Sequence, residues 1–261
     1  MGTRNEGLRQ KGGGQMKQCS GMKTAVGARR RISRSAWIAA TAFALLLLAL
    51  LGLRLYAWTS RGQEARMMVL VNPWNRVDDA EYTPRLRRLP NGLQVDRGCF
   101  KALTQMLEDC RSAGFQPVVC SAYRSREMQQ RLYDERVDEL MAEGHSRRQA
   151  EEMAVKTVAL PGTSEHELGL AVDLVDLDYQ LLDLEQENTP TQRWLMENAW
   201  RYGFILRYPP GAEEITGYRY EPWHYRYVGA APAEQIHLLG ITLEEYLSMF
   251  FSDTAEIVFE S

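Results

Sequence analysis

The chain has 261 residues, of which 45% are hydrophobic, 25% charged and 10% aromatic. This composition is typical of a globular protein and excludes a disordered, collagen-like or coiled-coil chain. The net charge of −3 is unevenly distributed, because residues 1–35 carry nine Lys or Arg against Glu6 alone, and so hold +8 and leave −11 for the remainder. Since a body with that charge repels phosphate backbones, nucleic acid is not expected as a partner.

An apolar segment without any charged residue follows the basic tail, from Ala36 to Leu53. Its 18 residues are close to the minimum length of a helix that crosses a bilayer. Trp37 lies at one end of the segment, and Tyr56 and Trp58 lie just beyond the other, as in the aromatic belts of membrane proteins. We therefore predict that residues 36–58 form a transmembrane signal anchor.

The charges on either side of this segment predict its orientation. The arginines within residues 29–34 precede it, and acidic residues dominate after it. The positive-inside rule then puts the basic tail in the cytoplasm and residues 59–261 outside, as a single-pass protein of the cell membrane. A cleaved signal peptide is the alternative, but its apolar core is usually about 7–15 residues long, and no small-x-small cleavage site follows Leu53.

The pattern of residues after the anchor predicts a short polar linker, 59–68, and one domain, 69–261. Helix 97–113 has an apolar face, and the motifs Ser146–Gln149 and Thr189–Gln192 are capping boxes that open helices. Because helices come first and strands then alternate with loops, we expect an α+β fold. The expected strands are 69–71, 116–121, 171–175, 204–207 and 223–227; the other expected helices are 125–143, 146–160, 189–203, 231–239 and 242–251; and an irregular arm with three prolines runs from 72 to 90.

Cysteine usage argues against a thiolate metal site. Cys19 precedes the apolar segment, and Cys99, Cys110 and Cys120 follow it, with no C-x-x-C pair among them. The three cysteines after the anchor allow one disulfide at most, and burial as small apolar side chains is equally compatible with the sequence.

Two of the four histidines lie in segments that indicate chemistry. His166 and Asp173 belong to S-E-H-E-L-G-L-A-V-D, and His224 belongs to E-P-W-H-Y-R-Y, which begins with Glu221. Two histidines and a carboxylate, with water in the fourth position, are the ligand pattern of a catalytic zinc. If the chain turns into a strand between Glu221 and His224, this carboxylate faces the metal-bound water without ligating the metal, which is the place of a general base.

A third segment, S-A-Y-R-S, follows the predicted strand 116–121 and contains Arg124. An arginine at such a strand end can offer a bidentate fork to a carboxylate or a developing oxyanion, although a surface ion pair is the alternative. His145 and His237 are interpreted as ordinary surface or core residues, and Asp176 as a solvated acid at a strand end.

These three blocks, S-x-Y-R-S, S-x-H-x-x-G-x-A-x-D and E-x-W-H-x-R-Y, together resemble the zinc D-alanyl-D-alanine carboxypeptidases of the VanY type. That group shares a wider fold with hedgehog signalling domains, D-Ala-D-Ala dipeptidases and lysostaphin-like enzymes. The resemblance spans about Val69 to Leu247 and includes N-P-W-N at 72–75, P-G-T at 161–163 and F-I-L-R-Y-P at 204–209.

The resemblance implies a small antiparallel sheet that carries a zinc site, in a zinc-dependent carboxypeptidase that removes the terminal D-alanine from peptidoglycan stem peptides. It implies that His166, Asp173 and His224 hold zinc, that Glu221 is the catalytic base and that Arg124 stabilises the transition state. The residues matched to positions near the bound peptide are Ser164, Gln129, Tyr123 and Ser125.

Other specificities and another class of function stay open. The same fold could trim an L,D bond, release a D-Ala-D-Ala dipeptide or cut a cross-bridge. A catalytically silent wall-peptide-binding module would be expected to lose Glu221 or a ligand, and a zinc store would need neither Glu221 nor Arg124. A serine mechanism is disfavoured, because there is no G-x-S-x-G and no S-x-x-K near a plausible base.

Overall fold

The computed structural model describes residues 43, 45–54, 62, 65–77 and 82–251. The chain divides into two units, residues 1–53 and 54–261. Residues 43 and 45–54 are helical. The rest of the predicted anchor 36–58 and the whole basic tail lie outside the described residues. In the described part of the chain, no helix has the length and hydropathy needed to cross a bilayer.

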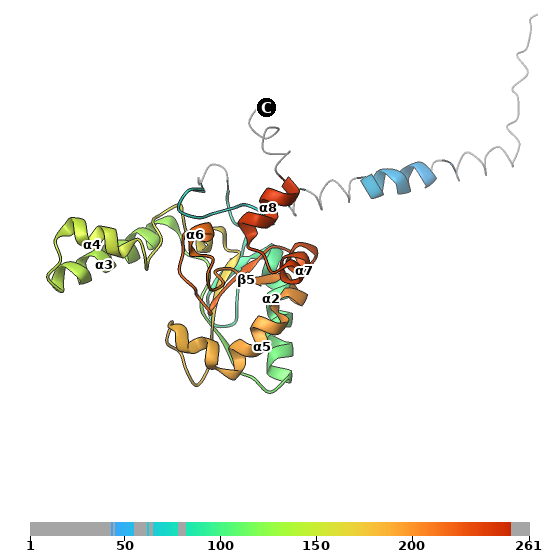
Figure 1. Cartoon of the computed structure of the whole chain (residues 1–261). Helices are drawn as coiled ribbons and strands as arrows, with labels where there is room; N and C mark the ends of the chain where they lie inside the picture. The colour runs from blue at the N-terminus through green and yellow to red at the C-terminus, as the bar shows by residue number, and fades with distance from the viewer. Residues whose placement is uncertain (1–42, 44, 55–61, 63–64, 78–81, 252–261) are drawn as a thin grey trace, which may run out of the picture. The chain divides into compact units, whose positions relative to one another are not determined.

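The second unit is built on a four-stranded antiparallel sheet with the order β3-β4-β6-β5. Figure 1 labels one of its strands, β5. Every residue of β4 is buried, because this apolar strand lies between β3 and β6 and is covered on its faces. The sheet confirms the predicted α+β class. Its strands are β3 (Pro117–Ser121), β4 (Ala171–Asp176), β6 (His224–Tyr227) and β5 (Phe204–Leu206).

Helix α2 (Arg97–Ser112) packs its predicted apolar face into the main core. Cys99, Leu103 and Met106 are fully buried there beside residues of β4. The carboxylate of Asp96 accepts from the backbone N–H of Gly98 at 2.8 Å and caps the helix. Helix α5 (Pro190–Asn198) and the 3-10 turn η3 (Ala199–Tyr202) lie against the same core.

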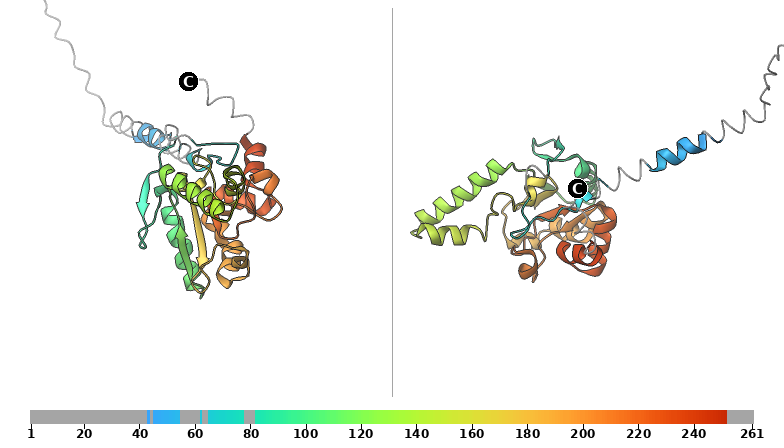
Figure 2. Two further views of the ribbon diagram at one scale, coloured as in Figure 1. Left: turned by 90° about the vertical axis from the view of Figure 1, so that its left-hand side faces the viewer. Right: turned by 90° about the horizontal axis from the view of Figure 1, so that it is seen from above.

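Helices α3 (Arg126–Ala142) and α4 (Arg147–Ala154) form a hairpin that stands beside the sheet and away from α5 and α7 (Figures 1 and 2). Its own small core is made of Val137, Leu140, Ala150 and Ala154. The capping box at Ser146 is confirmed, since Ser146 and Gln149 bond reciprocally, but α4 ends at Ala154, six residues before the predicted stop.

The C-terminal elements form a second apolar cluster against the sheet edge. Helices α7 (Ala230–Leu239) and α8 (Leu243–Phe251) contribute to this cluster, whereas the short helix α6 (Glu213–Thr216) precedes them and supplies none of its residues. Met68, within the predicted linker 59–68, is buried in this cluster with Ile205 of β5. The chain therefore makes core contacts shortly before residue 69.

Several local predictions were wrong. The predicted irregular arm contains a strand, β1 (Leu86–Arg88), which pairs with β2 (Gln94–Asp96) just after the arm in a hairpin turned by Gly92 at φ +91°. Residues 69–71 form no strand, because the Val69 carbonyl accepts instead from Arg226. Thr189 caps α5, but Gln192 does not reciprocate, since its side-chain amide donates to the Leu174 carbonyl.

Two side-chain predictions also had definite outcomes. Asp176 is buried rather than solvated, because Thr191 donates to its carboxylate from the start of α5. Among the described cysteines, Cys99, Cys110 and Cys120 are all free thiols, so the structure contains no disulfide between them.

Candidate active site

The two predicted blocks around the histidines meet at the middle of the sheet. His166 lies on the 3-10 turn η1 (Glu165–Leu168), Asp173 on β4 and His224 at the start of β6. The register of β4 and β6 puts Asp173 directly opposite His224. Gly169 ends the turn at φ +68° and lets the chain reverse from His166 into β4.

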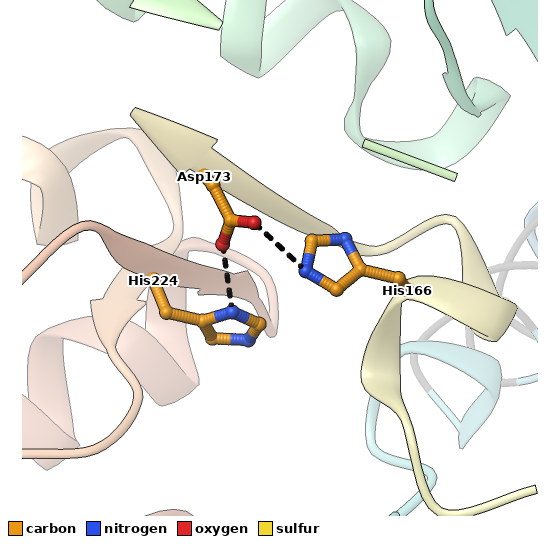
Figure 3. A group of neighbouring side chains, drawn as sticks. All are labelled: His166, Asp173 and His224. Carbon is orange, nitrogen blue, oxygen red and sulfur yellow. Dashed lines mark hydrogen bonds and ion pairs between the residues drawn. The ribbon is translucent and has the colours of Figure 1, made fainter. Parts of the chain in front are cut away.

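The three side chains form one buried cluster (Figure 3). Asp173 bridges the two rings, with 3.2 Å between His166 Nε2 and its Oδ2 and 3.0 Å between His224 Nδ1 and its Oδ1. The candidate ligand atoms of the three residues all lie within 4.8 Å of one another. One carboxylate and two imidazole nitrogens at this spacing fit a zinc ion with its fourth position open.

On each histidine, the ring nitrogen that faces away from Asp173 has its own hydrogen-bond partner, which is consistent with the other nitrogen being a metal ligand. The Nδ1 of His166 lies 2.7 Å from the carbonyl oxygen of Ala122, so it carries the proton and leaves the Nε2 lone pair towards the cluster. The Nε2 of His224 lies 3.4 Å from the carboxylate of Glu165, which leaves Nδ1 towards the cluster. Metal-binding histidines in proteins commonly make such outer hydrogen bonds.

Burial and neighbouring charges set the protonation of the cluster. Burial lowers the pKa of His166 to about 4, and the charge of Arg124 acts in the same direction. Burial alone would lower the pKa of His224, but its hydrogen bonds to Asp173 and Glu165 raise it to about 9. Burial alone would raise the pKa of Asp173, but the two histidines hold it well below its usual range.

Glu221 lies beside the cluster but outside the bridged set. A turn, in which the His224 N–H donates to the Glu221 carbonyl at 3.1 Å, separates the two residues as the sequence predicted. The Glu221 carboxylate is 3.9 Å from His224 Nδ1. Burial raises the pKa of Glu221 to about 7, so this carboxyl group can accept and release a proton near neutral pH.

Arg124 contacts the cluster from the end of β3, which pairs with β4 on the side opposite β6. It follows β3, and its Nη2 donates to Asp173 Oδ2 at 3.4 Å. Its other donors are held from behind, by Ser121 at 3.2 Å and by Gln129 at 3.0 Å. Gln129 is itself fully buried and donates to the Ala159 carbonyl at 2.7 Å, so the guanidinium orientation is set by the protein.

A cleft of about 750 Å³ opens onto these groups. Its walls include residues of α3, of the loop 156–159 and of the segment 218–224. Of the predicted substrate contacts, Tyr123 and Ser164 line the cleft. Ser125 and Gln129 are not among its lining residues: the Ser125 hydroxyl caps α3, and Gln129 lies behind Arg124.

Sequence reasoning missed two residues that contact His224. The ring of Tyr208 stacks on the His224 ring at a centroid distance of 4.8 Å. Glu165 contacts its far nitrogen, and an acidic residue directly before a predicted metal ligand was the available signal.

Known proteins include clear relatives of this chain. The family model described as VanY, D-alanyl-D-alanine carboxypeptidase, matches residues 92–230. The chain belongs to this family. The match includes Arg124, His166, Asp173, Glu221 and His224, and it confirms the resemblance expected from the three motifs.

Individual relatives of this family are similar over most of the second unit. A D-alanyl-D-alanine carboxypeptidase of Enterococcus faecalis is 44% identical over 181 residues, which are 69% of this chain and 65% of that protein, slightly less than two thirds of its length. A crystal structure of a mutant vancomycin-resistance D,D-pentapeptidase VanY with Zn(II) is 44% identical, with a TM-score of 0.63, over 70% of this chain and 99% of that one. VanYB in complex with D-alanine-D-alanine is 43% identical, with a TM-score of 0.64, over 70% and 98% of the two chains.

Proposed function

We propose that the protein is a zinc-dependent D-alanyl-D-alanine carboxypeptidase that removes the last D-alanine from peptidoglycan stem peptides. The observation that carries this proposal is the placement of Glu221 and Arg124 around the His166–Asp173–His224 cluster within one cleft. A binding module would not need this arrangement. Two similar structures, a VanY mutant with Zn(II) and VanYB with D-alanine-D-alanine, hold the metal and a substrate-like dipeptide as bound groups.

The residues of this chain divide the reaction between them. Zinc held by the three ligands would polarise the scissile carbonyl and lower the pKa of a bound water towards about 7. Glu221 takes a proton from the attacking water and returns it to the amine of the leaving D-alanine. Arg124 donates to the oxygen on which negative charge develops, and Gln129 and Ser121 keep its guanidinium aimed into the cleft.

The membrane anchor remains part of the proposal. The apolar segment 36–53, its aromatic flanks and the basic tail support a single-pass protein with the cleft outside the cell. The proposed substrate lies on that side of the membrane. Protease added to intact cells should digest the C-terminal part and spare the tail, whereas mature protein that begins shortly after Leu53 would instead make the enzyme a secreted one.

The deciding experiment is incubation of the purified full chain with pentapeptide and tetrapeptide stems, with and without a chelator, followed by mass spectrometry. We expect loss of one D-alanine from the pentapeptide and no product with the chelator. Cleavage of the tetrapeptide alone would assign an L,D specificity, and release of a dipeptide would assign a dipeptidase. Tight peptide binding without any product would identify a silent binding module.

A further inference from the structure

Glu165 is the buried acid of the site that the proposed reaction does not use. Its side chain is fully shielded from solvent, directly before His166 in η1. It does not contact His166; its Oε2 lies 3.4 Å from Nε2 of His224, the ring nitrogen turned away from Asp173. A buried carboxylate in this position needs a physical reason, because an isolated charge is costly to remove from water.

Two buried arginines compensate the charge of Glu165. Arg207 donates to it from Nε at 2.7 Å and Arg226 from Nη1 at 2.8 Å, and both side chains are fully buried. Because two guanidinium groups donate to one of its oxygens, Glu165 is a carboxylate and thus only an acceptor.

The two oxygens of Glu165 have different partners. Both arginines donate to Oε1, whereas Oε2 receives only the contact with His224. If Glu165 served only to compensate the arginine charges, its Oε2 would be a buried acceptor without a donor. Because His224 and Arg226 are two residues apart on β6, they project from the same face of the strand, and one carboxylate reaches both.

The arginines also attach this carboxylate to distant parts of the chain. Arg207 pairs with Glu244 of α8 through two bonds of 2.9 and 2.7 Å. Arg226 donates from Nη2 to the carbonyls of Met67 and Val69, both at 2.8 Å. The two arginines that bond to Glu165 are thus themselves held by α8 and by the backbone of residues 67 and 69.

We infer that Glu165 is a positioning residue for the zinc ligand His224: its Oε2 accepts the Nε2–H of the ring, so that the Nδ1 lone pair is kept towards the metal position. This inference rests on the proposed zinc peptidase function and deepens it. A carboxylate in this role fixes the ring orientation and makes the ligand nitrogen more basic, and loss of such a partner typically weakens metal binding about 10–100-fold.

Glu165→Gln tests this role with little change of shape. All the groups that face Glu165 are donors, whereas glutamine has one acceptor oxygen and a donor NH₂ group, so it cannot serve both the arginines and His224. We expect the zinc dissociation constant of the folded full chain, measured by competition with a chelator, to rise about 10–100-fold. A change of less than threefold would overturn the inference.

Two matched variants separate positioning from general loss of stability. Glu244→Gln neutralises a partly buried partner of Arg207 but leaves the contact between Glu165 and His224. Glu167→Gln changes the other buried acid of η1, which accepts from Gly162 and pairs with Arg126. Both variants should lower the unfolding temperature and keep the zinc dissociation constant within about threefold. If Glu244→Gln weakens zinc binding as much as Glu165→Gln does, the effect is loosening of the site and the inference fails.

Nitrogen NMR of labelled histidine in the zinc-loaded wild type provides a test that needs no variant. Nδ1 of His224 should carry the metal, and its Nε2–H should exchange slowly with solvent because it is bonded to Glu165. Coordination through Nε2 would overturn the inference even if Glu165→Gln does not fold. Neither measurement uses turnover, so a wild type that binds zinc in this way but cleaves no stem peptide would refute only the proposed function.

Discussion

Replacement of Glu221 by glutamine removes the basic carboxylate but keeps nearly the same side-chain shape. The Glu221 carboxylate stands 3.9 Å from His224 Nδ1, and the bridged set of His166, Asp173 and His224 is complete without it. The backbone bonds that shape the turn, from Glu221 N–H to the Tyr208 carbonyl and from His224 N–H to the Glu221 carbonyl, do not involve the side chain. We therefore expect Glu221→Gln to fold normally and to bind about one zinc per chain.

The cost of this change should appear in the proton transfers. A general base contributes about 10²–10⁴-fold to the rate, or roughly 3–5 kcal/mol of barrier. The upper part of this range is expected, because burial raises the pKa of Glu221 to about 7, where a base works efficiently at neutral pH. The Michaelis constant should change much less than kcat, since the amide keeps the shape of the side chain.

The assay is steady-state release of D-alanine from a pentapeptide stem, measured beside zinc content and peptide affinity. Glu214→Gln, an exposed acid on α6 outside the cleft, is the matched control and should keep wild-type kcat. A Glu221→Gln protein that keeps zinc and cleaves within about threefold of the wild-type rate would remove Glu221 as the base. Loss of zinc together with activity would instead make Glu221 a ligand and would refute our description of the site.

Three further predictions concern substrate, metal and fold. Arg124→Lys keeps the charge but loses the planar fork, so kcat/KM for the stem peptide should fall about 10²–10³-fold, with both KM and kcat affected; an unchanged KM would contradict this. In zinc-free protein the pKa of His224 is about 9, so at pH 7 zinc must displace a proton from this ring. Zinc affinity should accordingly rise from pH 7 to about pH 9. Calorimetry in buffers of different ionisation enthalpy should detect about one proton released on zinc binding at pH 7. A pH-independent affinity would refute the protonation of His224 in the zinc-free protein. Gly203 and Gly114 both have positive φ, but a Cβ at Gly203 would lie 2.9 Å from the Gly229 backbone, whereas Gly114 faces open space. Gly203→Ala should therefore destabilise the fold by clearly more than the roughly 1–2 kcal/mol that φ alone costs at Gly114→Ala, as judged by denaturant unfolding.

Local patterns predicted most elements of the second unit because their causes are local. The apolar face of α2, the reciprocal Ser146–Gln149 cap and the buried run of β4 depend on residues close in sequence. The β1–β2 hairpin was missed although Gly92 marks its turn, since Pro84 and Pro90 stand on either side of the three-residue strand β1 and argue locally against a strand. Asp176 was misjudged because its partner Thr191 lies 15 residues away on another element.

The amino-acid sequence was enough to predict the metal ligands, the general base and the role of Arg124, because three motifs in this order resemble those of VanY-type enzymes and carry residue types that suit zinc hydrolysis. Which ring nitrogen of each histidine faces the metal position could not be predicted locally, since Ala122 and Glu165 lie 44 and 59 residues from the rings that they contact in the folded chain. The tertiary structure also decided that Gln129 supports Arg124 from behind. Long-range packing brings such partners together, and no local pattern of residues records it.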